Sequence, residues 1–125
     1  MMAYEKFEAW QSAHHLALEV FIRTDSWPRT ELYGLTSQVR RAALSVPTNI
    51  AEGAAKRGSR EFGRYLDIAL GSLSELSYLL RFGHDRGLLH DVEWQSLESL
   101  RGSTGRLVYG LYRSVRLKAY GRDAR

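Results

Sequence analysis

The chain has 125 residues, no cysteine and a formal net charge of +4. This length predicts one domain with a single core, and without cysteine there are no disulfides or thiolate metal sites. No apolar run approaches the roughly 20 residues that span a bilayer, and the N-terminal residues lack the apolar core of a secretory signal. We therefore expect a cytoplasmic protein with no membrane contact.

The first predicted helix covers residues 6–24. Apolar residues recur on one face at helical spacing, namely Phe7, Trp10, Ala13, Ala17, Val20 and Phe21. A connection follows, because Pro28 disfavours a helical conformation of the residue before it. We expect that residue, Trp27, to cover one end of the core.

The second predicted helix covers residues 31–56, with Thr30 as its N-cap. Pro47 lies inside it and would cost about 3 kcal/mol in an isolated helix. We expect the helix to continue with a kink, because the apolar face continues beyond the proline. Asn49 then falls beside the core, where a buried amide needs hydrogen-bond partners. We expect Asn49 and Glu52 to share a structural polar network.

The third predicted helix covers residues 60–86. Its apolar seam advances in alternating steps of four and three, through Phe62, Leu66, Ala69, Leu73, Leu76, Leu80 and Gly83. Gly58 is placed to end the preceding helix in a left-handed conformation, and Ser59 to cap the new one. Gly71 and Ser72 lie off the seam, which favours a contact with another subunit on that side.

The fourth predicted helix covers residues 92–117, between a cap at Asp91 and a frayed tail over 118–125. Gly87 ends the preceding helix. The seam of the fourth helix is predicted to contain Leu97, Leu100, Thr104, Leu107 and Leu111. Four helices with short connections predict an all-α fold, a single antiparallel up-down-up-down four-helix bundle over residues 1–125.

Basic residues gather in two parts of the sequence. From Arg101 to Arg125 there are seven basic residues and one acidic residue. Such clusters attract polyanions, although solvated faces of a helical protein are the alternative interpretation. The candidate nucleic-acid-binding residues are Arg40, Arg41, Lys56, Arg57, Arg60, Arg64, Arg106, Arg113, Arg116 and Lys118. Nearby Tyr109, Tyr112 and Tyr120 are candidates for base stacking or for helix packing.

No catalytic or metal constellation is apparent. His14 and His15 are adjacent, so they point about 100° apart on a helix and do not share a metal from one face. One class of helical-bundle ribonuclease uses an arginine followed by four to six residues and then a histidine. Here the separations from Arg81 to His84 and from Arg86 to His90 are too short. We expect a non-enzymatic protein without cofactor or metal.

The order of several short strings resembles a known family. They are Tyr33-Gly34-Leu35, Gln38-Val39-Arg40-Arg41-Ala42-Ala43, Ser45-Val46-Pro47-Thr48-Asn49-Ile50-Ala51-Glu52-Gly53, Ser59-Arg60-Glu61-Phe62, Leu66-Asp67-Ile68-Ala69 and Gly71-Ser72-Leu73-Ser74-Glu75-Leu76. With Phe7-Glu8 and Trp10, they are similar to the four-helix-bundle proteins encoded within bacterial 23S ribosomal RNA intervening sequences, also called S23 ribosomal proteins. Accessory proteins of diversity-generating retroelements are related to this family.

The resemblance implies an antiparallel four-helix bundle that assembles into a ring-like homopentamer. It also implies basic surfaces, since the related accessory proteins bind nucleic acid and a reverse transcriptase, and no catalytic activity is established for the family. Within the family motif, the basic positions that the resemblance carries over are Arg40, Arg41 and Arg57. We therefore expect salt-dependent, largely sequence-nonspecific binding of RNA or DNA. A protein-interaction scaffold without direct nucleic-acid contact is the alternative.

Overall fold

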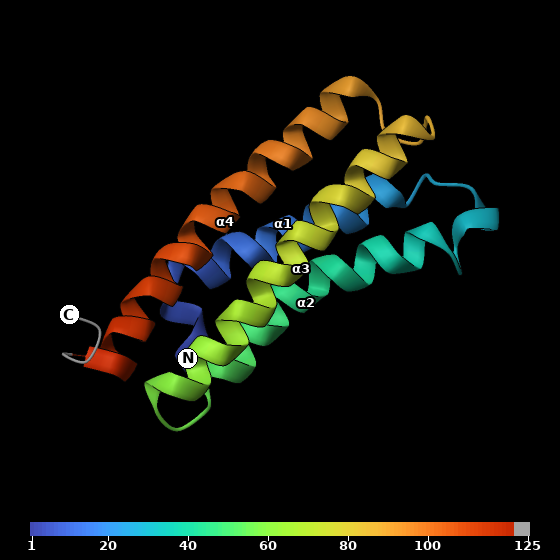
Figure 1. Ribbon diagram of the computed structural model, residues 1–125. Coiled ribbons are helices and arrows are strands. Elements are labelled where there is room, and N and C mark those ends of the chain that lie inside the picture. Colours follow the sequence, from blue (N-terminus) through green and yellow to red (C-terminus); the bar gives the residue numbers. More distant parts are fainter. Residues whose placement is uncertain (122–125) are drawn as a thin grey trace.

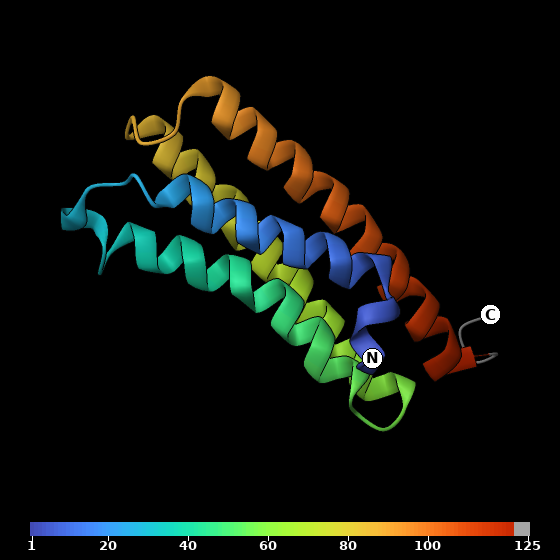
Figure 2. The same cartoon turned by 180° about the vertical axis from the view of Figure 1, so that it is seen from behind.

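The computed structural model describes residues 1–121 and contains helices and no strand within that range (Figures 1 and 2). The α-helices are α1 (Glu8–Thr24), α2 (Leu35–Ala54), α3 (Ser59–Asp85) and α4 (Asp91–Tyr120). Short 3₁₀ helices, η1 (Ala3–Lys6) and η2 (Arg29–Glu31), precede α1 and α2. The all-α prediction is confirmed.

The helices pack in a closed cycle in which α1 contacts α2 and α4, and α3 contacts α2 and α4. Successive helices run in opposite directions, so the bundle is antiparallel and up-down-up-down as predicted (Figure 1). Because the directions alternate, the α2–α3 turn lies at the same end of the bundle as the C-terminus of α4 (Figure 2). None of the described helices is both long and apolar enough to cross a membrane.

The core confirms the predicted seam of α3 and corrects that of α4. From Leu66 to Gly83 every seam residue of α3 is buried. In α4, however, Leu107 is 37% exposed, and Val108 and Val115 are buried. Adjacent stripes of α4 are both apolar, so helical spacing alone does not decide which one faces the core.

Helix α2 begins later than predicted. Residues 29–31 form the separate helix η2, and Gly34 is the N-cap of α2, so Thr30 does not cap it. Pro47 lies inside a continuous α2, as expected. Gly58 has φ 85°, a conformation that glycine adopts without strain, so the predicted positive φ is confirmed. It lies beyond Ala55, the C-cap of α2, and therefore does not itself end that helix.

The remaining boundaries follow from very short connections. Gly58 also serves as N-cap of α3, so Ser59 is the first residue of that helix and not its cap. Gly87 has φ 81° just after the end of α3, as predicted. The N-cap of α4 is His90 and not Asp91. Helix α4 continues to Tyr120, so residues 118–120 are helical and not frayed, while 122–125 lie outside the described residues.

Asn49 finds its partners one turn back along α2. Its Nδ2 donates to the Ser45 carbonyl at 2.8 Å and lies 2.9 Å from the Ser45 hydroxyl, which pairs with the Ser72 hydroxyl at 2.7 Å. Glu52 is exposed and makes no side-chain hydrogen bond within residues 1–121, so the predicted pairing with Asn49 is wrong. Ser72 is buried against α2 and not on an outer face, whereas neighbouring Gly71 is exposed.

Trp27 closes the end of the core near the α3–α4 turn, as predicted. Its side chain is buried and lies so close to Gly83 that a Cβ there would be 3.1 Å from the ring. Glycine at this seam position therefore allows the indole to pack on the α3 backbone.

Candidate nucleic-acid interface

One end of the bundle brings together basic residues that are far apart in sequence. The end of α2, the start of α3 and the end of α4 meet there (Figure 1). We call this surface the basic end and define it by Lys56, Arg57, Arg60, Arg64, Arg113, Arg116 and Lys118. Parts of the two basic stretches thus lie at the same end of the bundle.

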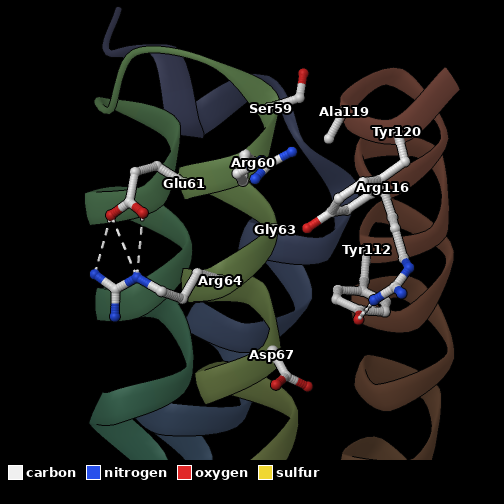
Figure 3. Close-up of a pocket in the computed structure, with 10 residues that line it drawn as sticks. All are labelled: Ser59, Arg60, Glu61, Gly63, Arg64, Asp67, Tyr112, Arg116, Ala119 and Tyr120. Carbon is white, nitrogen blue, oxygen red and sulfur yellow. Dashed lines mark hydrogen bonds and ion pairs between the residues drawn. The ribbon is translucent and has the colours of Figure 1, made fainter. Parts of the chain in front are cut away.

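A groove lies between the first turns of α3 and the last turns of α4 (Figure 3). Its volume is about 330 Å³. The lining residues are Ser59, Arg60, Glu61, Gly63, Arg64, Asp67, Tyr112, Arg116, Ala119 and Tyr120. Both walls therefore carry arginine, and the α4 wall adds two tyrosines.

The Tyr120 ring is shared by arginines from both walls. The Cζ atom of Arg60 lies 5.0 Å from the ring centroid, and that of Arg116 lies 5.2 Å from it. Arg116 also donates to the Tyr112 hydroxyl at 2.8 Å. This hydrogen bond raises the pKa of Arg116 above its usual value, so the guanidinium stays charged.

Carboxylates neutralise only part of the groove. Arg64 pairs with Glu61 at 3.0 Å, which lowers the pKa of Glu61, and Figure 3 shows this pair directed away from α4. Asp67 lies farther along α3, at the inner end of the groove (Figure 3). Within residues 1–121, neither Arg60 nor Arg116 forms an ion pair.

Around the groove, further cations face solvent. Lys56 is exposed, with its Nζ 5.5 Å from the Tyr65 ring centroid. Arg57, Arg113 and Lys118 are also exposed. In the part of the chain that the structure describes, these three residues make no ion pair. Such charges attract phosphates.

Arg40 does not belong to this surface, although the sequence suggested it. Its guanidinium bonds the Thr24 hydroxyl at 2.9 Å and Asp25 at 2.9 Å, and lies 4.6 Å from the Phe21 ring centroid. Its side chain is only 23% exposed. Arg40 therefore ties the end of α1 to α2.

Two other predicted residues are exposed but lie outside the basic end. The helical rise places Arg41 about 20 Å from the end of α2. Arg106 lies a similar distance from the end of α4, where it donates to the Ser103 hydroxyl at 3.1 Å. Neither residue lines the groove.

The groove itself was not predicted, although its sequence signal was present. Tyr112, Arg116 and Tyr120 are four residues apart and share one stripe of α4. Arg60 and Asp67 similarly share a stripe of α3. The sequence does not show that these two stripes face each other.

The opposite end of the bundle holds a histidine with several contacts. His84 stacks on Trp94 with ring centroids 4.2 Å apart, and its Nε2 lies 2.6 Å from an Asp91 oxygen. The bond to Asp91, with a weaker one to Asp85, raises the pKa of His84. No group of three or more potential ligands from His, Cys, Asp and Glu is poised to hold a metal among the described residues.

The architecture defines the class of protein: an antiparallel four-helix bundle with a cationic end. The family model of the 23S rRNA-intervening sequence proteins matches residues 5–110, and the chain belongs to this family. The suggested relation to retroelement accessory proteins stays a prediction. The matched segment ends before Tyr112, Arg116 and Tyr120, which form the α4 wall of the groove.

A solved structure has the same fold. It is a crystal structure of a protein with unknown function from the S23 ribosomal protein family of Bacteroides thetaiotaomicron. The two chains are 16% identical and superpose with a TM-score of 0.77, covering 84% of this chain and 95% of the other. No curated protein matches this chain. The predicted family is confirmed, and it carries no established activity to transfer.

Proposed function

We propose that this protein is a non-enzymatic, cytoplasmic homo-oligomer that binds RNA or DNA through the basic end. The observation that supports the proposal most is that basic residues from α2–α3 and α4 lie at one end of the bundle, where Arg60, Arg64 and Arg116 line one groove. Arg60 and Arg116 support the proposal further, because neither forms an ion pair with a carboxylate among the described residues. A polyanion would supply the missing countercharge.

Contacts of this kind are made mainly to phosphates. Binding releases counterions from the nucleic acid, so affinity falls as salt concentration rises and depends little on base sequence. For a single strand, the logarithm of the binding constant falls with a slope of about −0.7 per neutralised phosphate. The proposal therefore predicts a steep salt dependence.

Assembly would multiply these contacts. The family resemblance implies five copies, and an exposed row on α3 that includes Ile68, Gly71, Tyr78 and Phe82 supports self-association. Several basic ends in one particle would convert a weak contact into multivalent binding. Light scattering of the purified protein measures the number of copies directly.

A titration of fluorescent RNA across salt concentrations tests the binding proposal. We expect the double variant Arg57→Gln/Arg113→Gln to bind more weakly and to lower the salt slope by about 0.7 for each lost contact. The matched control is Arg29→Gln, because Arg29 is exposed on η2, away from the basic end. No binding at low salt, a flat salt response, or an equal loss in the control would contradict the proposal.

The alternative is a scaffold for another protein. Tyr33 is almost fully exposed beside Leu32 near the start of α2. These two residues and Leu44 line a second groove, separate from the one between α3 and α4. Such apolar groups are typical of protein contacts. Co-purification of a defined protein, without nucleic acid and with no salt-dependent RNA binding, would favour this function.

A further inference from the structure

The groove between α3 and α4 differs from the rest of the basic end because it combines cations, aromatic rings and a cavity. We infer that it holds one unpaired nucleotide of a single-stranded nucleic acid. The phosphate lies against Arg60 and Arg116, and the base stacks on Tyr120. This inference rests on the proposed function and adds to it a preference for single strands.

The size of the groove limits what can enter. Its volume of about 330 Å³ is at the small end of ligand pockets, which hold roughly 300–1,000 Å³. A duplex keeps its bases paired and stacked inside, so it offers only phosphates and groove edges to the protein. A loop or single strand can insert an unstacked base without breaking a pair.

The charges place the phosphate. Arg60 projects from α3 and Arg116 from α4, and each guanidinium carbon lies about 5 Å from the same ring. A phosphate between them would reduce the repulsion of two like charges, and the planar guanidinium matches its oxygens. The Asp67 carboxylate at the inner end of the groove repels phosphate there, which favours a phosphate position at the outer end, beside Arg60 and Arg116.

The tyrosines have separate roles. Tyr112 packs against the core and holds Arg116 through its hydroxyl. Tyr120 lies in the last turn of α4 and keeps 38% of its surface exposed. The guanidinium carbons of Arg60 and Arg116 lie over this ring, so an entering base takes the place of one of them on the π-face, the only part of the ring that stacking needs.

This α4 wall lies beyond residues 5–110, the segment that matches the family model. The match to the family model therefore covers the α3 wall of the groove and not the α4 wall. The preference for unpaired nucleotides is a property of this chain's own C-terminal helix.

The test compares two probes: an oligo-uridine of about 12 nucleotides and an RNA duplex of the same length, each titrated by fluorescence anisotropy. We expect Tyr120→Leu to weaken oligo-uridine binding roughly 5- to 100-fold and to leave duplex binding unchanged. Tyr33→Leu is the matched control, since Tyr33 is exposed near the start of α2. It should change neither affinity. Circular dichroism should show equal helicity in all three proteins.

A second measurement locates the base. An oligo-uridine that contains 4-thiouridine is photo-crosslinked to the wild-type protein, and we expect crosslinks on the walls of the groove, within residues 59–67 or 112–120. Crosslinks confined to other segments would overturn the groove assignment. So would a Tyr120→Leu variant that binds both probes like wild type or loses both equally. A wild-type protein that binds neither probe would instead overturn the proposed function, and this inference with it.

Discussion

At the scale of single residues, Arg40 shows how a basic side chain can serve structure instead of binding. Its neighbour Arg41 has the same charge and the same sequence context but faces solvent. Only Arg40 reaches α1, where it bonds Thr24, Asp25 and the Phe21 carbonyl. The two residues point about 100° apart on α2. The sequence does not show which of these two directions faces α1.

We therefore expect Arg40→Gln to lower the free energy of unfolding by roughly 1–3 kcal/mol, because charged hydrogen bonds between α1 and α2 are lost. Its nucleic-acid affinity should stay that of wild type. Arg41→Gln is the control and should change stability by less than about 0.5 kcal/mol. Urea denaturation measures both, and equal stability of the two variants would contradict the structural role of Arg40.

At the scale of elements, the α3–α4 turn contains a pH-dependent contact. His84 near the end of α3 binds Asp91 at the start of α4 and Asp85 beside it. These carboxylates raise the pKa of His84, and the bond to His84 is the main cause that lowers the pKa of Asp85. Protonated His84 therefore joins the two helices more strongly than neutral His84 does.

The sign of the pH effect follows from the raised pKa. The protonated contact stabilises the fold fully below the ordinary histidine pKa of about 6.5, and this contribution is lost as pH rises through the higher folded value. We expect the difference in Tm between wild type and His84→Gln to be largest below that pH and to shrink in alkaline buffer. His15→Gln, an exposed control, should show no such trend. A difference that stays constant with pH would contradict this account.

At the scale of the whole molecule, the exposed row on α3 concerns assembly. Tyr78 is 64% exposed and its ring lies 6.3 Å from that of Phe82. In the homo-oligomer proposed above, burial of these rings between subunits would supply much of the driving force. Because Tyr78 is exposed in the subunit, its replacement should leave the fold intact.

We expect Tyr78→Lys to shift the native mass toward a single subunit, measured by light scattering, with unchanged helicity. Val92→Lys is the control, since Val92 is exposed at the start of α4. A wild-type protein with the mass of one subunit would contradict the oligomer. An assembled Tyr78→Lys would place the interface on another face.

Much of the fold could be predicted because it depends on local periodicity. The seam of α3 from Leu66 to Gly83 and the left-handed glycines Gly58 and Gly87 follow from helical spacing and backbone sterics. The choice of Val108 over Leu107 in α4 did not, because two adjacent stripes of that helix are apolar. Packing against α1 and α3 decided between them.

The sequence by itself determined four amphipathic helices, their order, and two basic stretches. Only the tertiary structure decided that those stretches meet at one end, that Arg40 is withdrawn from them, and that Arg60 and Arg116 share the ring of Tyr120. The physical reason is that helical spacing reports which residues share a face of one helix. Which faces and which ends become neighbours depends on how the helices pack together.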